Sequence, residues 1–554
     1  MKKIFFLFVL FQASISFSQV KKEENKVTEK WPNGNKKSEG QYNVYGIETG
    51  KWFYWHENGK LKEENNYFKG KLHGKVAYFY ESGKPQDEGY FVNGFQDSIK
   101  IHWYESGQKQ EEGFYKKGAK DSVWVIWYET GEKQQEIIYK NGNGKLVSFW
   151  DKQGKLSVKD GSGVAIFYFE NGKPKEEVNF FNGIRNSTYA SWYNTGQKKS
   201  EGFYVQSKDS IPVELKSGIW KEWYVSGQLK MEGQYADGKK NGVWKEWFED
   251  GKMWKETTFK SDKEDGVYRQ WFDNGQLNYT GSCVIGEKEG MWVWYYKNAQ
   301  KDMEGIFKNG KQNGKWSYHF PEGGVEFEGI YADGLKNGKW TYNYKSGKRW
   351  REGDYKANLR EGHWLYYYES GLKVQEGDFV EDREEGLWKS WYENGKPKDE
   401  GSFVKGKMEG NWKGWFPNEK LQYEGPLKNS LKNGYWKLYT DKGIVMEEGT
   451  YIGGIKNGHW KTNFTTGIIE SEGDYFDAKP TGTWVYYYEA GQKFQKQTFK
   501  NGKLDGKSTV WYESTKLKSQ TSYKDGKPDG KWKFYDKDGK LINTIKYVDG
   551  KKVE

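Results

Sequence analysis

The chain has 554 residues, of which only 35% are hydrophobic, and 89 Lys and Arg outnumber 78 Asp and Glu to give a net charge of +11. This composition excludes compact cores of Leu, Ile and Val, while the 18% of aromatic residues excludes an aromatic-poor disordered polymer. Both signs of charge are interspersed along the chain, so no specific nucleic-acid site is expected, since such a site needs basic residues clustered on one face.

Residues 1–19 have the pattern of a secretory signal peptide. Two lysines precede an apolar run from Ile4 to Phe11, and small residues follow up to Ser18. The apolar run is too short to cross a bilayer, and no later run approaches that length, so no transmembrane segment is expected. The sequence therefore predicts export to the periplasm, the cell surface or the extracellular space. Cys283 is the only cysteine, which excludes an internal disulfide.

A 24-residue period dominates the rest of the chain. Residues 20–49 form a charged linker and a partial capping repeat, residues 50–144 a first array, and residues 145–217 irregular repeats with an insertion. Residues 218–554 form a second, strictly periodic array. In that array a glycine recurs every 24 residues, at Gly218, Gly242, Gly266, Gly290, Gly314, Gly338, Gly362, Gly386, Gly410, Gly434, Gly458, Gly482, Gly506 and Gly530. Such regularity is typical of a solenoid or ribbon of about 21 units.

Each unit is predicted to be a β-hairpin. Two short aromatic runs are separated by turn sequences such as ENGK (57–60) and DNGQ (273–276), and Asn-Gly between strands favours a primed turn. Glycines arrive too often for a helix, and the aromatic residues do not recur at helical spacing. The fold class is therefore all-β, an elongated antiparallel β-hairpin repeat ribbon or solenoid.

One aromatic column is predicted to be the structural core. A tryptophan repeated at one depth stacks against neighbouring hairpins, and glycines in the second strand leave room for its ring. Alternating Lys and Glu columns are expected to form a solvated cross-strand ladder rather than a metal row. The core column consists of Trp220, Trp244, Trp292, Trp316, Trp340, Trp364, Trp388, Trp412, Trp436, Trp460, Trp484 and Trp532.

A second aromatic stripe is the candidate binding surface. Adjacent residues of a strand point to opposite faces, so the paired aromatics of each unit place rings on both faces. A long apolar stripe suggests a partner, whereas a curved ribbon or a local bulge would bury it. The stripe consists of Trp223, Trp247, Trp271, Tyr295, Tyr367, Trp391, Trp415, Tyr487 and Trp511.

No catalytic motif accompanies these columns. The six histidines fall singly within hairpins, and HExxH, CxxC, P-loop and GxSxG motifs are missing. Cys283 falls in a core column and is expected to be a small buried hydrophobe. We therefore expect no enzyme, no cofactor and no metal site.

The pattern GxWxxWYxxGxxxxEGxY, as in GVWKEWFEDG (242–251) and GLWKSWYENG (386–395), resembles the MORN repeat in its bacterial variant. Chains described as YwqK-family antitoxins of toxin–antitoxin systems carry this variant. The resemblance covers nearly everything after residue 30. It implies a β-hairpin ribbon used for protein or lipid interaction and scaffolding, without intrinsic catalysis. Choline- and glucan-binding wall modules are similar more weakly, since they also place Gly, Trp and Tyr-Tyr along hairpins.

Three functions remain open from the sequence. The first is a noncatalytic exported scaffold that binds a protein partner. The second is a binder of cell-envelope polysaccharide, with the second aromatic stripe stacking on sugars. The third is an antitoxin-like protein of a toxin–antitoxin system.

Overall fold

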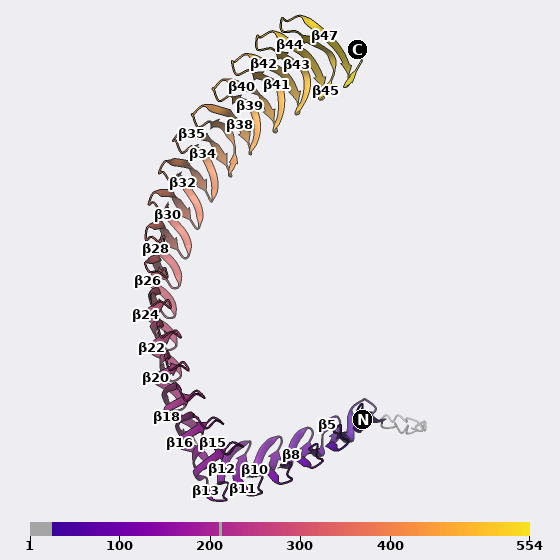
Figure 1. Cartoon of the computed structure of the whole chain (residues 1–554), viewed down its shortest axis with the longest axis vertical. Helices are drawn as coiled ribbons and strands as arrows, with labels where there is room; N and C mark the ends of the chain where they lie inside the picture. The colour runs from indigo at the N-terminus through magenta and orange to yellow at the C-terminus, as the bar shows by residue number, and fades with distance from the viewer. Residues whose placement is uncertain (1–24, 210–212, 554) are drawn as a thin grey trace, which may run out of the picture. The chain divides into compact units, whose positions relative to one another are not determined.

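The computed structural model describes residues 25–209 and 213–553, and the predicted signal peptide lies outside them. Within these residues the chain forms 48 β-strands and no helix (Figure 1). The predicted all-β antiparallel hairpin repeat is confirmed. The chain divides into two compact units, Met1–Met253 with Thr258–Lys263, and Trp254–Thr257 with Glu264–Glu554.

The first unit is an antiparallel meander. Its strands are β1 (Asn25–Lys30), β2 (Lys36–Tyr42), β3 (Glu48–Trp55), β4 (Leu61–Phe68), β5 (Lys71–Leu72), β6 (Gly74–Phe79), β7 (Pro85–Val92), β8 (Phe95–Trp103), β9 (Lys109–Lys116), β10 (Ala119–Trp127), β11 (Lys133–Lys140), β12 (Asn143–Trp150), β13 (Leu156–Lys159), β14 (Ser162–Tyr168), β15 (Pro174–Phe181), β16 (Ile184–Trp192), β17 (Lys198–Gln206), β18 (Glu214–Trp223), β19 (Leu229–Ala236) and β20 (Lys239–Trp247). Strands β21 (Met253–Lys260) and β22 (Lys263–Trp271) hold residues of both units.

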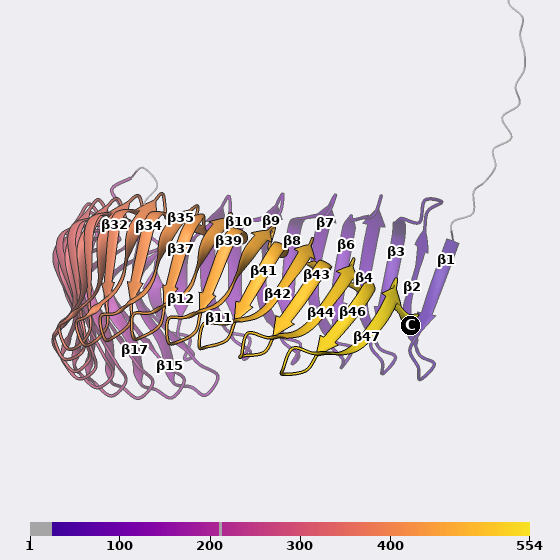
Figure 2. The same cartoon turned by 90° about the horizontal axis from the view of Figure 1, so that it is seen from above.

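The second unit repeats the same meander, and Figure 2 shows its strands side by side with turns along both edges. Its strands are β23 (Leu277–Val284), β24 (Glu287–Tyr295), β25 (Lys301–Lys308), β26 (Lys311–His319), β27 (Val325–Ala332), β28 (Leu335–Asn343), β29 (Arg349–Lys356), β30 (Leu359–Tyr367), β31 (Lys373–Val380), β32 (Arg383–Trp391), β33 (Pro397–Val404), β34 (Lys407–Trp415), β35 (Leu421–Lys428), β36 (Leu431–Lys432), β37 (Gly434–Tyr439), β38 (Val445–Ile452), β39 (Ile455–Asn463), β40 (Ile469–Phe476), β41 (Lys479–Tyr487), β42 (Lys493–Lys500), β43 (Lys503–Trp511), β44 (Leu517–Lys524), β45 (Lys527–Pro528), β46 (Gly530–Tyr535), β47 (Leu541–Val548) and β48 (Lys551–Lys552).

The two edges of the meander use different turns, and the turn predicted for ENGK is wrong. At that edge only Gly59 has a positive φ, of 85°, and its N–H donates to the His56 carbonyl. A primed turn needs positive φ at both central residues, so this is a type I turn followed by a left-handed glycine. Asn58 instead accepts a bond from the Lys60 N–H and donates to the Glu81 carbonyl one repeat further.

The primed turn lies at the opposite edge. There Lys69 and Gly70 have φ of 52° and 73°, and they join the paired residues Phe68 and Lys71. Two consecutive positive φ angles match the right-handed twist of the flanking strands. The repeat therefore alternates one primed two-residue turn with one longer turn that also bonds to its neighbour.

The period glycine forms a bulge within the first strand of each repeat. Gly362 has a φ of 66° inside β30, and the register of the adjoining strand shifts between Glu352 and Asp354. Left-handed backbone costs an ordinary residue about 1–2 kcal/mol, which explains glycine here. In three repeats Ser98, Ser122 and Ser187 hold this conformation instead, with φ of 60° to 72°.

Each core tryptophan packs across the boundary between two hairpins. A Cβ built on Gly353 of β29 would lie 2.3 Å from the ring of Trp364 in β30, so only glycine fits under the indole. The Trp364 Nε1–H donates to the Asp354 carbonyl at 3.1 Å. Tyr355 and Phe379 meet the ring edge-on, with centroids 5.2 and 6.1 Å away. The glycine predicted beneath the ring thus belongs to the preceding hairpin.

The core tryptophans are almost all inaccessible to solvent. Trp532 is partly exposed, although it contacts Tyr547. The other eleven members of the predicted column have relative exposures of 0–7%: Trp220, Trp244, Trp292, Trp316, Trp340, Trp364, Trp388, Trp412, Trp436, Trp460 and Trp484. In the first unit Trp52 and Trp124 occupy the same place, and the irregular segment packs Leu146, Phe149, Val158 and Ala165 instead.

Candidate functional site: an aromatic stripe and a cavity

The second aromatic stripe is half-buried along its whole length. Its members end the first strand of their repeats, directly after a register shift such as that between Ser390 and Trp391. Each repeat adds two strands, so neighbouring stripe residues recur about every 10 Å. Partial exposure is common to all nine, namely Trp223, Trp247, Trp271, Tyr295, Tyr367, Trp391, Trp415, Tyr487 and Trp511.

Charged side chains of neighbouring strands cover part of this stripe. The Lys373 ammonium lies 5.5 Å from the centroid of the Trp391 ring, and Lys198 lies 5.7 Å from that of Trp223. The Tyr487 hydroxyl donates to Glu472 at 2.7 Å. The surface is therefore a mixed aromatic and charged face rather than a bare apolar strip.

The predicted Lys–Glu ladder lies on the same sheet. The ammonium and carboxylate of Lys221 and Glu232 are 3.8 Å apart, and Lys389 and Glu400 have the same separation. Both pairs are well exposed to solvent, so each contributes little to stability. The predicted cross-strand pairs are therefore present in some repeats, as a solvated surface feature.

Tyrosine hydroxyls connect successive repeats, a contact that the sequence analysis missed. Tyr368, the residue before the longer turn, donates from its hydroxyl to the Trp391 carbonyl at 3.0 Å. Tyr392 donates in the same way to the Trp415 carbonyl at 2.7 Å. The acceptor belongs to the stripe residue of the next repeat, so stripe and turn are held together. The sequence does carry a signal for this contact, because a tyrosine recurs every 24 residues just before the longer turn.

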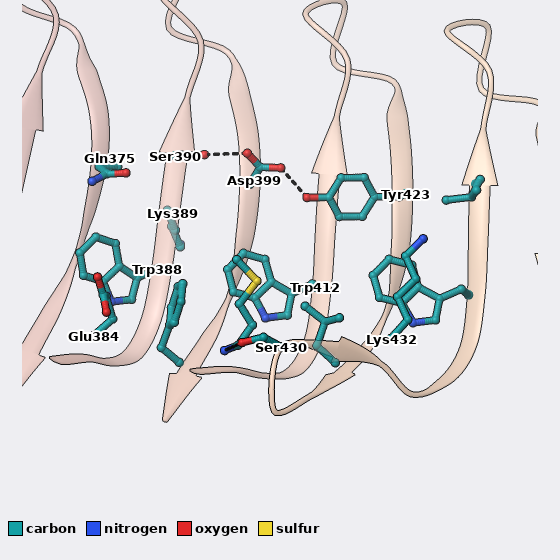
Figure 3. A pocket seen from close by; sticks show the side chains of 15 residues that line it. Gln375, Glu384, Trp388, Lys389, Ser390, Asp399, Trp412, Tyr423, Ser430 and Lys432 are labelled. Carbon is teal, nitrogen blue, oxygen red and sulfur yellow. Dashed lines mark hydrogen bonds between the residues drawn. The ribbon is translucent and has the colours of Figure 1, made fainter. Parts of the chain in front are cut away.

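A cavity of about 620 Å³ opens on the tryptophan face of the second unit. Two residues beyond the core tryptophan, four successive repeats carry large rings, at Trp294, Tyr318, Tyr342 and Tyr366. The next three repeats have Ser390, Gly414 and Leu438 at this position, and all three line or adjoin the cavity around Trp388, Trp412 and Trp436 (Figure 3). The cavity thus lies where the large rings of the four preceding repeats give way to smaller residues.

One wall of the cavity is a short hydrogen-bonded chain. Figure 3 shows Asp399 between Ser390, whose hydroxyl donates at 3.2 Å, and Tyr423, whose hydroxyl donates at 2.5 Å. Burial first, and then the Asp399 carboxylate, raise the pKa of the Tyr423 phenol. The Tyr423 ring lies over Gly414, where a Cβ would be 2.3 Å from it. Asp399 is thus a carboxylate held by neutral donors.

The described residues contain no group of three or more His, Cys, Asp or Glu that could hold a metal ion. Cys283 is buried, and burial raises the pKa of its thiol to about 11. Within residues 25–209 and 213–553 no helix is long and apolar enough to cross a membrane.

Solved structures share little with this chain. It is 10% identical to a chain in the crystal structure of TcdB2-TccC3-Cdc42, covering 94% of itself and 35% of that chain with a TM-score of 0.12. It is 9% identical to a chain of the Photorhabdus luminescens Tc holotoxin pore carrying the TccC3 mutation D651A, covering 95% of itself and 30% of that chain, also with a TM-score of 0.12. The chain thus spans about a third of the length of these proteins. No curated protein sequence matches it.

The MORN repeat variant matches thirteen times, in both units and over just over half of the chain. The matched residues are 48–69, 72–93, 96–117, 120–141, 162–182, 216–237, 240–261, 264–282, 384–405, 408–429, 480–501, 504–525 and 528–549. The chain belongs to the MORN repeat variant family.

Proposed function

We propose that this chain is a noncatalytic, exported scaffold that binds a protein partner along its repeats. The observation that carries the proposal is the regular surface of the second aromatic stripe. Nine repeats offer a half-exposed ring at the same position, and such rings in adjacent repeats lie about 10 Å apart. Charged side chains flank them, as Lys373 does Trp391 and Glu472 does Tyr487. A partner that contacts several repeats gains affinity from each one. Catalysis would instead need groups that converge on one site.

Polysaccharide binding is the weaker candidate. Stacking on a sugar requires an open ring face, whereas at Trp223 and Trp391 a lysine ammonium lies near the ring. An antitoxin role would need a chain retained in the cytoplasm, against the signal peptide expected at residues 1–19. The protein-binding scaffold therefore accounts for more of the surface.

The experiment is a paired-variant capture from the native envelope. The mature chain is tagged and crosslinked in place, and bound proteins are identified for the parent, for Trp391→Ala with Trp415→Ala, and for Leu387→Ala with Val404→Ala. The control residues are exposed at 49% and 46%, Leu387 on the strand of Trp391 and Val404 on β33, between the strands of Trp391 and Trp415. We expect the stripe variant to lose the partner and the control to keep it, with both retaining the parent circular dichroism. Equal capture by all three proteins would contradict the proposal.

Two further measurements separate the alternatives. Mass spectrometry of the exported chain should give a new N-terminus after Ser18 or Gln19, and an unprocessed cytosolic chain would favour the antitoxin role. Titration with envelope polysaccharides should leave the tryptophan fluorescence unchanged. A saturable fluorescence change, lost in the Trp391→Ala and Trp415→Ala variant, would favour the polysaccharide binder.

A further inference from the structure

The chain repeatedly places its own cation over a core tryptophan. A lysine four residues before the tryptophan projects its ammonium onto the indole, as Lys336 does onto Trp340 at 4.3 Å. A desolvated cation over an aromatic face is a favourable contact. The same pair recurs at 3.6–4.5 Å in Lys120–Trp124, Lys216–Trp220, Lys240–Trp244, Lys288–Trp292, Lys336–Trp340, Lys432–Trp436 and Lys456–Trp460.

One repeat carries an acid at this position and still receives a cation. Glu264 stands where the lysine is expected, and Lys255 of the adjoining strand lies 4.0 Å from its carboxylate. The same Lys255 ammonium lies 4.8 Å from the centroid of Tyr268, the ring that replaces the core tryptophan. In this repeat a neighbouring lysine thus fills the place above the ring.

At the cavity the acid is present and the cation is missing. Glu384 stands four residues before Trp388, and Figure 3 shows the two side chains close together. The residue equivalent to Lys255 is Gln375, which is neutral, and the Glu384 carboxylate has no ion-pair partner among residues 25–209 and 213–553. In the next repeat the same position is Met408, so Trp412 also lacks a lysine.

The remaining lining of the cavity favours a positively charged occupant. Asp399 adds a second carboxylate whose hydrogen-bond partners, Ser390 and Tyr423, are uncharged. The two lysines of the lining are already engaged, Lys432 over Trp436 at 4.5 Å and Lys389 with Glu400 at 3.8 Å. Two other repeats without the lysine, those of Trp316 and Trp484, keep a large ring two residues after the tryptophan. The rings of Tyr318 and Tyr486 lie 6.1 Å from their indoles, measured between centroids.

We propose that this cavity binds a lysine side chain of a partner protein, with its ammonium at Glu384 and its alkyl chain against Trp388 and Trp412. The occupant is the one that the chain itself supplies in its other repeats. The inference rests on the proposed function, since it names one contact by which the scaffold holds a protein. It concerns the tryptophan face and not the second aromatic stripe.

The test uses two substitutions that place a lysine of the chain itself in the cavity, where it would occupy the proposed site. Glu384→Lys restores the lysine found at Lys336, and Gln375→Lys restores the lysine found at Lys255. The matched control is Glu381→Lys, which makes the same change of charge in the exposed turn three residues before Glu384; the equivalent turn position naturally carries Lys405 with φ of 51°. The probe is a labelled short lysine peptide with blocked termini, and its acetyl-lysine form is the neutral control.

We expect carbodiimide to couple the lysine peptide to Glu384, as mapped by mass spectrometry of the full chain. Affinity for the peptide should fall by about tenfold or more in Glu384→Lys and in Gln375→Lys, as expected for loss of an ion pair and a cation–π contact. Glu381→Lys should match the parent. Equal binding to all variants, an equal fall in all three, or equal binding of the acetyl-lysine peptide would overturn the proposal.

The result is independent of the test of the proposed function. If the envelope partner is captured equally by the parent and by Glu384→Lys, the scaffold stands and the lysine site is wrong for that partner. If the lysine peptide binds as expected while no envelope protein is captured through the stripe, the cavity stands and the stripe proposal fails. A dimer of the parent chain that Glu384→Lys dissociates would overturn the partner assignment, because a second copy would then supply the lysine.

Discussion

The ring of Trp364 lies so close to Gly353 of the preceding hairpin that a methyl group there would come within 2.3 Å of it. At two positions where a smaller residue replaces the tryptophan, the residue beneath is larger than glycine. Gln497 faces Ser508 across the strands, and Asn65 precedes the strand that carries Val76 at the tryptophan position. Where a tryptophan meets a larger residue, as Trp532 meets Thr521 at the same positions, the ring is partly exposed. Ring and glycine therefore act as one packing unit.

We expect Gly353→Ala to destabilise its repeats by about 2 kcal/mol, since the added methyl must displace a buried indole. The loss should be local, so hydrogen exchange measured by mass spectrometry should show faster exchange in β29 and β30. Gln497→Ala, beside the small Ser508, is the control and should leave exchange in β42 and β43 nearly unchanged. Similar effects of the two substitutions would contradict the close packing of Trp364 on Gly353.

Ser122→Gly should stabilise the first unit by up to about 1 kcal/mol, because glycine adopts positive φ without steric cost. Ser122 has a φ of 60° at a position where most repeats carry glycine. The reciprocal Gly362→Ser should lower stability by a similar amount. Thermal unfolding followed by circular dichroism measures both. The contrasting variant is Thr188→Gly, at an extended residue of β16, and it should lower the stability of the first unit.

Tyr368→Phe removes the hydroxyl that donates to the Trp391 carbonyl at 3.0 Å. We expect a cost of about 1 kcal/mol, the usual net value of one such bond, expressed as faster exchange of the longer turn and of the end of β32. Tyr45→Phe is the matched control, since Tyr45 is 81% exposed. An unchanged exchange rate in Tyr368→Phe would show that the hydroxyl is dispensable.

Alkaline pH should unfold the chain. Burial first, and then a hydrogen bond to Glu472, raise the pKa of Tyr487 from 10.0 to about 12, and burial with Asp302 does the same for Tyr296. A raised folded-state pKa stabilises the folded chain fully below pH 10, and this stabilisation disappears as the pH rises from 10 towards 12. Ultraviolet absorbance of tyrosinate should therefore lag behind that of the chain unfolded in urea, then rise together with loss of the β circular dichroism. Coincident titration of folded and unfolded chains would contradict this.

The repeat, its hairpins and the glycine beneath Trp364 were predictable because each recurs at a fixed spacing and has one steric explanation. The turns were assigned incorrectly because Asn58-Gly59 suits both a primed turn and a left-handed glycine after a type I turn. The exposure of Trp391 depends on the register shift at Ser390. That shift could not be predicted, because no particular residue type marks its position in the sequence. The cavity could not be predicted from the residue type that is most common at each position of the repeat. It arises where individual residues differ from that common type, namely Ser390, Gly414, Glu384 and Met408.

The contacts between Trp364 and the preceding hairpin determine how a chain of this kind can become longer or shorter. Its indole covers Gly353 and donates to the Asp354 carbonyl. The boundary between two repeats is therefore formed by a tryptophan on one side and a glycine on the other. Removing or duplicating one whole 24-residue segment recreates the same boundary, whereas removing half of a segment leaves an indole without its glycine. Gene duplication can therefore lengthen the array in whole steps, and each new copy is free to lose a lysine or a ring and acquire a cavity of its own.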